Sequence, residues 1–105
     1  MRETKVLFGA GKDRYGIPLT GVNLRLTQIA RYASDKFGGY TLYWHDGGWI
    51  GPDGRPLEER GFTVSVLGAV LPEAETAFAR KVREAFSQGT VVLIRSTGEA
   101  EFIEE

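Results

Sequence analysis

The chain has 105 residues, of which 42% are apolar and 26% charged, and its formal net charge is −1 with a pI near 5.9. This length fits one domain, residues 1–105, with a single core. The absence of cysteine excludes a disulfide framework, and the balanced charge disfavours a dedicated nucleic-acid binder, which usually carries a basic surplus.

The N-terminal part has the pattern of a strand, a loop and a helix. Residues 5–8 form a short apolar run that ends at Gly9, which predicts a buried strand. Residues 9–18 contain three glycines and one proline and predict a loop. From Val22 to Phe37, apolar residues recur every three or four positions, which is typical of one face of an α-helix, and two glycines then end the helix.

A second strand and an arm follow. Residues 40–45 are rich in β-forming side chains and predict a strand. Turn signals at 46–48 and 52–54 enclose a short stretch around Trp49, and residues 57–60 pair back across the second turn. We therefore expect a small hairpin or arm between the second and third core strands.

The C-terminal part again has a strand, a helix and a strand. Residues 62–67 alternate between apolar and polar positions, which predicts a half-buried strand. Pro72 begins a helix whose acidic first turn suits the positive end of the helix dipole. Residues 90–95 form the last core strand, and 99–103 form a short extra strand.

This order of elements predicts an α+β, ferredoxin-like β-α-β-β-α-β sandwich. Its four-stranded antiparallel sheet has two helices on one face. The other face is uncovered, and apolar groups such as Tyr43 and Leu67 on it favour a sheet-to-sheet homodimer. The alternative is a solvated face on a monomer, which Thr41, Thr63 and Ser65 support.

One stretch of the sequence resembles a known group of proteins. It runs Phe37-Gly-Gly-Tyr-Thr, then Gly48-Trp49, Gly54 and Glu58-Glu59, followed by an apolar strand. This order resembles the F-G-G-x-T … G-x-W … D-G … E pattern of a group of small uncharacterised bacterial and phage proteins. The resemblance implies a ferredoxin-like α+β fold and brings no activity or catalytic residue.

Side chains suited to binding cluster between Trp44 and Arg60. Aromatic rings and arginines in a glycine-rich segment suit stacking on a partner or a ring-shaped ligand. The candidate binding residues are Tyr43, Trp44, His45, Trp49, Arg55 and Arg60. The alternative for Trp49 is that it folds back to cover an edge of the core.

His45, the single histidine, is the candidate general base. Adjacent strand residues point to opposite faces, so a pair between His45 and Asp46 is not expected. The alternative is a half-exposed histidine at a turn. If the protein is an enzyme, His45 would act in a cofactor-free, dimeric α+β barrel, with Tyr43, Trp44 and Arg95 around it.

The first loop offers a second, smaller candidate site. Gly9-Ala-Gly-Lys12 resembles half of a phosphate-binding loop without the full motif, and Lys12 and Arg14 are candidate anion ligands. The alternative is a flexible, solvated loop. One histidine and no cysteine give no recognised metal-ligand spacing, and no cofactor is predicted.

These observations favour a non-catalytic binding or regulatory module with a phage or host-defence role. It would engage a protein or small ligand through the open sheet face or the Trp44–Arg60 segment, and the cofactor-free enzyme is the alternative. The sequence lacks a bilayer-length apolar run and a signal peptide, so we expect a cytoplasmic protein. The abundance of Arg, Glu and Gly also favours a thermophilic source.

Overall fold

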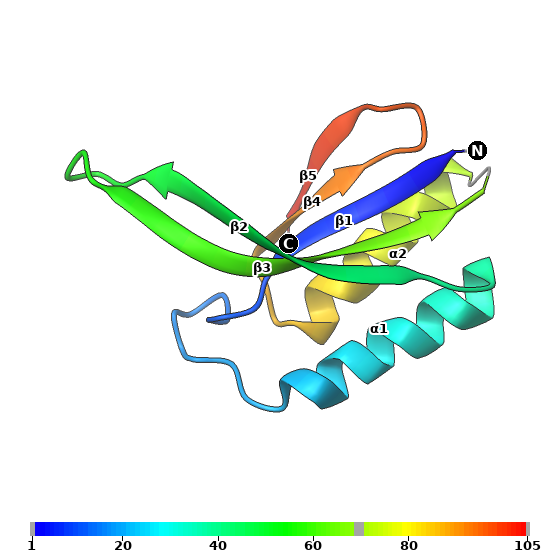
Figure 1. Cartoon of the computed structure of the whole chain (residues 1–105), viewed down its shortest axis with the longest axis horizontal. Helices are drawn as coiled ribbons and strands as arrows, with labels where there is room; N and C mark the ends of the chain where they lie inside the picture. The colour runs from blue at the N-terminus through cyan, green and yellow to red at the C-terminus, as the bar shows by residue number, and fades with distance from the viewer. Residues whose placement is uncertain (1, 69–70, 105) are drawn as a thin grey trace.

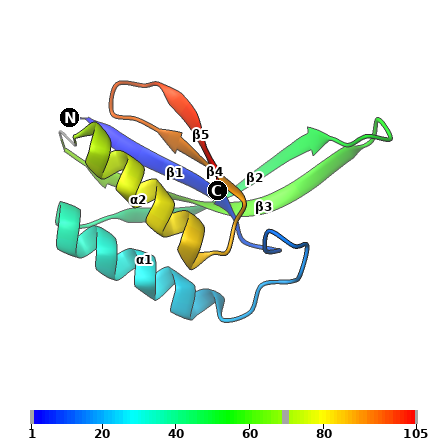
Figure 2. The same cartoon turned by 180° about the vertical axis from the view of Figure 1, so that it is seen from behind.

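Five strands form one antiparallel sheet, and two helices cover one of its faces (Figures 1 and 2). The computed structural model describes residues 2–68 and 71–104. The elements in chain order are β1 (Glu3–Gly9), α1 (Val22–Phe37), β2 (Thr41–Ile50), β3 (Pro56–Leu67), α2 (Pro72–Ala85), β4 (Thr90–Ile94) and β5 (Ala100–Glu104). Neither helix is both long and apolar enough to span a membrane, as judged over the described residues.

The strand order is β2-β3-β1-β4-β5, so the prediction of a four-stranded sheet is wrong. The fifth strand pairs with β4 along its whole length, from Thr90 opposite Glu104 to Ile94 opposite Ala100. A tight turn makes this return possible, because Gly98 adopts a φ of 95° and its N–H donates to the Arg95 carbonyl. The extra strand buries Ile103 at the edge of the core.

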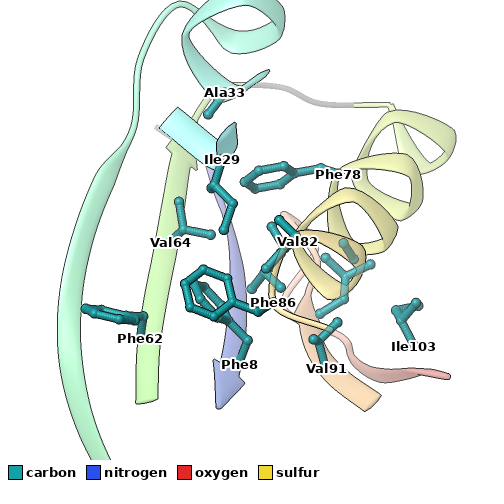
Figure 3. Packing of buried hydrophobic residues seen from close by; sticks show 14 of the residues in the cluster. Phe8, Ile29, Ala33, Phe62, Val64, Phe78, Val82, Phe86, Val91 and Ile103 are labelled. Carbon is teal, nitrogen blue, oxygen red and sulfur yellow. The ribbon is translucent and has the colours of Figure 1, made fainter. Parts of the chain in front are cut away.

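The core lies between the sheet and the helices (Figure 3). Side chains of β1 and β3 that lie opposite each other, such as Val6 and Val64, point to the same face and meet the helices. Phe78 and Phe86 reach this layer from α2 and the residue that follows it. The apolar residues whose spacing predicted α1 lie on the face of the helix that points to the core, where Ile29 is buried.

The arm between β2 and β3 is longer than predicted. Instead of turning at 46–48, β2 stays paired with β3 from Thr41 opposite Ser65 to Ile50 opposite Pro56. The reversal comes at 51–54, where Gly54 has a φ of 79° and its N–H donates to the Gly51 carbonyl at 2.9 Å. Residues 46–60, which we call the arm, extend beyond the rest of the sheet (Figure 1).

The face of the sheet opposite the helices, the reverse face, carries apolar and polar side chains together. The strand register places Leu7, Tyr43, Val92 and Phe102 there, and Phe102 is 72% exposed. Thr63 also lies on this face but is buried by its neighbours. The face therefore combines the features of both sequence-based alternatives.

Replacing Gly61 by alanine is expected to destabilise the protein by about 1–3 kcal/mol, through overpacking. A Cβ atom there would overlap the Phe8 carbonyl oxygen and lie 2.8 Å from His45 Nε2. Gly47→Ala is the matched control, because a Cβ at Gly47 meets nothing within 4 Å. Thermal unfolding of both variants measures the difference, and equal stability of the two would contradict the close approach.

Candidate active site

A notch opens in the sheet where β1 stops and the arm begins. Gly9 is the last residue of β1 and lies opposite Gly61 of β3. One further hydrogen bond, from the Ala10 N–H to the Arg60 carbonyl at 3.4 Å, follows before the chain turns away. Beyond this point β3 lacks its β1 neighbour, and hollows on both faces of the sheet meet at the notch.

The larger hollow, which we call the Trp44 pocket, lies between the arm and the first loop. Its volume is about 690 Å³, within the usual range for small-molecule sites. The residues lining it are Gly9, Ala10, Gly11, Lys12, Asp13, Gly16, Trp44, Leu57, Glu58, Glu59, Arg60 and Gln88. Four separate segments of the chain thus contribute to one pocket.

Trp44 provides the aromatic surface of this pocket. Its ring centroid lies 3.9 Å from that of Phe62, with 36° between the planes, so the core supports the indole from one side. The residue is nevertheless 60% exposed. A ring held in this way offers its outer surface to a ligand at little entropic cost, because its orientation is already set.

Charges of both signs surround the aromatic surface. Lys12 and Arg60 supply cations, and Glu58 and Glu59 supply carboxylates. Arg60 Nε lies 3.3 Å from Asp46 Oδ1, whereas the Lys12 ammonium makes no ion pair within the described part of the chain. Such a lining suits a ligand that itself carries both charges.

The first loop is an ordered wall of the pocket. Asp13 Oδ1 accepts hydrogen bonds at 2.9 Å from the backbone N–H groups of Tyr15 and Ile17. The Leu19 N–H donates to the Gly11 carbonyl at 3.0 Å. These bonds close the loop on itself, so its backbone follows a defined path around the pocket.

The smaller hollow, which we call the His45 hollow, lies on the reverse face and has a volume of about 480 Å³. His45 Nδ1 lies 2.8 Å from Thr63 Oγ1, which fixes the imidazole against β3. Gly9, Gly47 and Gly61 leave open space beside the ring. Asp46 Oδ1 bonds to Arg60, so it is not the partner of His45.

The structure separates the candidate residues into different places. Trp44, Arg60 and Lys12 line the Trp44 pocket, while His45 lines the hollow on the other face. Arg14 Nε donates to the Ser87 carbonyl at 3.4 Å. The binding and anion roles suggested by the sequence stay predictions.

The remaining candidates lie away from both hollows or outside the described residues. Tyr43 stands on the reverse face next to Lys5. Arg55, at the tip of the arm, lies with its Nε 3.9 Å from Asp53 Oδ2. The backbone of Trp49 pairs within the arm, but its side chain lies outside the described part of the structure.

The reverse face also carries an ion pair that shifts two pKa values. The hydrogen bond from Ser65, and then that from Lys5, lowers the pKa of the Glu3 carboxyl. The hydrogen bond to Glu3 is the main reason that the pKa of Lys5 is raised. Both shifts favour the ionised forms, the Glu3 carboxylate and the Lys5 ammonium, in the folded protein at neutral pH.

The sequence did not mark Gln88 as a candidate, and it marked Glu58 and Glu59 only as part of the Trp44–Arg60 segment. The two glutamates belong to the arm, whose length the turn signals concealed. Gln88 lies between α2 and β4 and reaches the pocket only through the fold. No pattern in the sequence marks it.

Two solved structures of one enzyme have a fold similar to that of this chain. No family model and no curated protein matches the sequence. A solved structure of phage SAM lyase in the apo state covers 98% of this chain and 88% of its own, with a TM-score of 0.67 and 16% identity. Phage SAM lyase in complex with S-methyl-5′-thioadenosine covers the same shares at 16% identity, with a TM-score of 0.63.

These neighbours correct our functional expectation. The fold is similar, over nearly the whole chain, to that of an enzyme in both solved structures, so the prediction of a non-catalytic binding module is wrong and the enzyme alternative is favoured. The phage origin of the neighbours agrees in part with the resemblance of the sequence to small bacterial and phage proteins. At 16% identity, the similarity to phage SAM lyase is a similarity of the α+β fold.

Proposed function

We propose that this protein is an enzyme that binds S-adenosylmethionine in the Trp44 pocket and cleaves it as a lyase, releasing S-methyl-5′-thioadenosine. The observation that carries the proposal is the match to phage SAM lyase over 98% of the chain. The Trp44 pocket adds independent chemical support, because it combines an aromatic surface with charges of both signs.

The lining of the pocket suits the parts of this substrate. S-adenosylmethionine carries a flat base, a ribose, a sulfonium cation, an ammonium and a carboxylate. The exposed indole of Trp44 suits stacking with the base. Lys12 suits the carboxylate, and Glu58 and Glu59 suit the ammonium and the ribose hydroxyls.

The proposed reaction is balanced within the substrate. The product S-methyl-5′-thioadenosine is the substrate without its four-carbon amino-acid chain, so the bond that breaks joins the sulfonium sulfur to that chain. Both electrons stay on sulfur, which becomes a neutral thioether. As this bond breaks, the carbon released from sulfur either forms a bond to the fragment's own carboxylate oxygen, which gives a lactone, or forms a double bond to the next carbon, which gives up a proton to a base.

An apolar wall favours this step. The sulfonium charge disappears as the bond breaks, so a site that solvates a cation poorly stabilises the transition state relative to the bound substrate. Leu57 supplies an apolar side chain for that wall. The second route also needs a proton acceptor, and Glu58 and Glu59 are carboxylates of the arm in the lining of the pocket.

The test is incubation of the purified full-length chain with S-adenosylmethionine, followed by chromatography against authentic S-methyl-5′-thioadenosine. We expect time-dependent product from the wild type and from Arg55→Ala, whose side chain lies at the tip of the arm. Absence of substrate breakdown at every protein concentration would overturn the proposal.

The His45 hollow is the competing location within the same proposal. It has one supporting observation, an imidazole fixed by Thr63 next to open space. If His45→Ala loses product formation while remaining folded, the reaction belongs to the reverse face, with His45 as the base. We expect His45→Ala to keep its activity, because the Trp44 pocket lies across the sheet.

We also retain two structural proposals from the sequence. The order β2-β3-β1-β4 supports a ferredoxin-like sandwich that β5 extends. Exposed Tyr43, Leu67 and Phe102 support pairing of two copies. The molar mass of the protein in solution tests the second proposal.

A further inference from the structure

The Trp44 pocket lies against a free backbone edge of β3. Four successive residues of this strand, from Leu57 to Arg60, line the pocket. Successive side chains of a strand point to opposite faces of the sheet, so a pocket that meets four residues in a row lies along the backbone edge. This edge is exposed because β1 stops at Gly9 while β3 continues into the arm (Figure 1). The pocket therefore takes the place in which β1 would continue.

The strand register decides which backbone groups face this space. The Gly51 N–H donates to the Arg55 carbonyl at 2.9 Å, and the β2–β3 register continues from there without interruption. Bonded and non-bonded positions alternate along an antiparallel ladder, so the odd-numbered residues of β3 bond to β2 and the even-numbered residues face away from it. The Ala10 N–H agrees with this direction, because it donates to the Arg60 carbonyl at 3.4 Å.

Among the described residues of the arm, Glu58 alone has both backbone groups free on this edge. The Arg60 carbonyl already accepts a hydrogen bond from Ala10, and Pro56 has no N–H. Glu58 lies between them, with an N–H and a carbonyl that both face the pocket. In an antiparallel sheet such a residue exchanges two hydrogen bonds with one residue of the next strand. The pocket therefore offers the pairing site of a single missing strand residue.

A free α-amino acid carries the two groups that this site requires. Its ammonium can donate to the Glu58 carbonyl, and its carboxylate can accept from the Glu58 N–H, as the backbone of a strand residue would. Both bonds are charge-assisted and therefore stronger than those between neutral groups. Lys12, in the facing loop, adds a cation for the carboxylate. A longer peptide fits poorly, because Pro56 and the bond from Ala10 limit the free edge to one residue.

We propose that the amino-acid end of S-adenosylmethionine pairs with the backbone of Glu58 as one residue of an antiparallel strand. This inference rests on the proposed function and names the groups that recognise the part of the substrate that S-methyl-5′-thioadenosine lacks. The side chains of Glu58 and Glu59 are exposed, so ordering them around a ligand costs entropy. The backbone groups of a paired strand are already fixed in direction and hold the four-carbon chain in one place.

The test compares S-adenosylhomocysteine, which keeps the amino-acid end on a neutral sulfur, with S-methyl-5′-thioadenosine, which lacks that end. Isothermal titration calorimetry of the full-length chain gives both affinities. We expect the wild type to bind S-adenosylhomocysteine more tightly by about tenfold or more, the gain that two charge-assisted hydrogen bonds imply. An isomer of S-adenosylhomocysteine with its amino group one carbon further from the carboxylate keeps both charges but not the spacing of a strand residue. This isomer should lose most of the gain.

Two variants of Glu58 separate its backbone from its side chain. Glu58→Pro removes the N–H and leaves the β2–β3 ladder in place, because proline is tolerated where the N–H faces away from the paired strand. Glu58→Ala is the matched control, since it removes the same carboxylate and keeps the N–H. We expect a preference of about threefold or less in Glu58→Pro and of about fivefold or more in Glu58→Ala. Ile50→Pro, on the outer edge of the arm, should keep the wild-type preference.

The outcomes distinguish this inference from the proposed function. Equal affinity of the wild type for the two compounds overturns the backbone pairing and leaves the proposed function intact, and so does an equal loss of preference in Glu58→Ala and Glu58→Pro. Failure of the wild type to bind either compound overturns the proposed function itself. If Glu58→Pro does not fold, the isomer decides, because flexible side chains would tolerate the moved amino group and a strand edge would not.

Discussion

Replacing Glu75 by glutamine is expected to lower the free energy of unfolding by about 3 kcal/mol, because it breaks a buried charge network. Glu75 is 1% exposed, at the start of α2. Its Oε2 accepts a hydrogen bond from the Thr4 hydroxyl at 2.6 Å and one from the Ser96 N–H at 2.7 Å. Its Oε1 lies 3.6 Å from an Arg95 guanidinium nitrogen.

This network joins the first turn of α2 to three parts of the sheet. Arg95, which is 15% exposed, also bonds to Glu101 of β5 and to the Pro72 carbonyl. The hydrogen bond to Glu101 is the main reason that the pKa of Arg95 is raised, and the charge of Glu75 adds to it. A glutamine at position 75 would present an N–H to one of these donors and leave it unsatisfied. The loss stays at the lower end of the range for buried pairs, because Arg95 keeps Glu101.

Glu101→Gln is the matched control, because it removes the other carboxylate from the same arginine. The Glu101 side chain is 49% exposed, so its pair with Arg95 is screened by water, and we expect a loss of about 1 kcal/mol or less. Urea or thermal unfolding measures both variants, and the Glu75 change should lower Tm by on the order of 15 °C. Equal losses for the two variants would show that burial does not govern this network.

Much of the fold followed from periodicity and turn chemistry. The apolar spacing between Val22 and Phe37 coincides with α1, and Pro72 begins α2. The short extra strand predicted at 99–103 corresponds to β5, although its pairing with β4 in the same sheet was not predicted. The length of the arm was harder to predict for a physical reason. Glycines at 47 and 48 resemble a turn, but glycine also fits an extended strand, and pairing with β3 along the arm decided between the two conformations.

The candidate site was predicted only in part, because it is assembled from distant segments. Strand alternation alone already placed Trp44 and His45 on opposite faces, although both were assigned to one binding segment. Lys12 was recognised as a cation in a glycine-rich loop. Its position opposite the arm depends on where β1 ends, and the approach of Gln88 depends on a missing side chain at Gly9. Neither contact leaves a local signal in the sequence.

Trp44→Ala is expected to lower kcat/KM for S-adenosylmethionine by roughly 5- to 150-fold, the range that the loss of one base–aromatic stack implies. The aromatic surface is the part of the pocket that binds the base, and alanine replaces it with open space. The effect on Tm should be smaller than that of Glu75→Gln, because Trp44 is 60% exposed and the substitution removes a contact with Phe62 at the edge of the core rather than a buried charge. Trp44→Phe keeps a ring on Phe62 and should retain most of the activity.

Tyr43→Ala is the matched control for this measurement, because Tyr43 is an exposed aromatic residue on the adjacent position of β2 and points to the reverse face. Steady-state assays of product release, with Tm recorded for each variant, separate loss of the stack from loss of the fold. We expect the control to keep the wild-type kcat/KM. Equal losses in both variants would mean that the integrity of β2, rather than the indole, determines activity. Full activity in Trp44→Ala would show that the base does not bind in this pocket. The contrast between two neighbouring aromatic side chains therefore assigns the reaction to one face of the sheet.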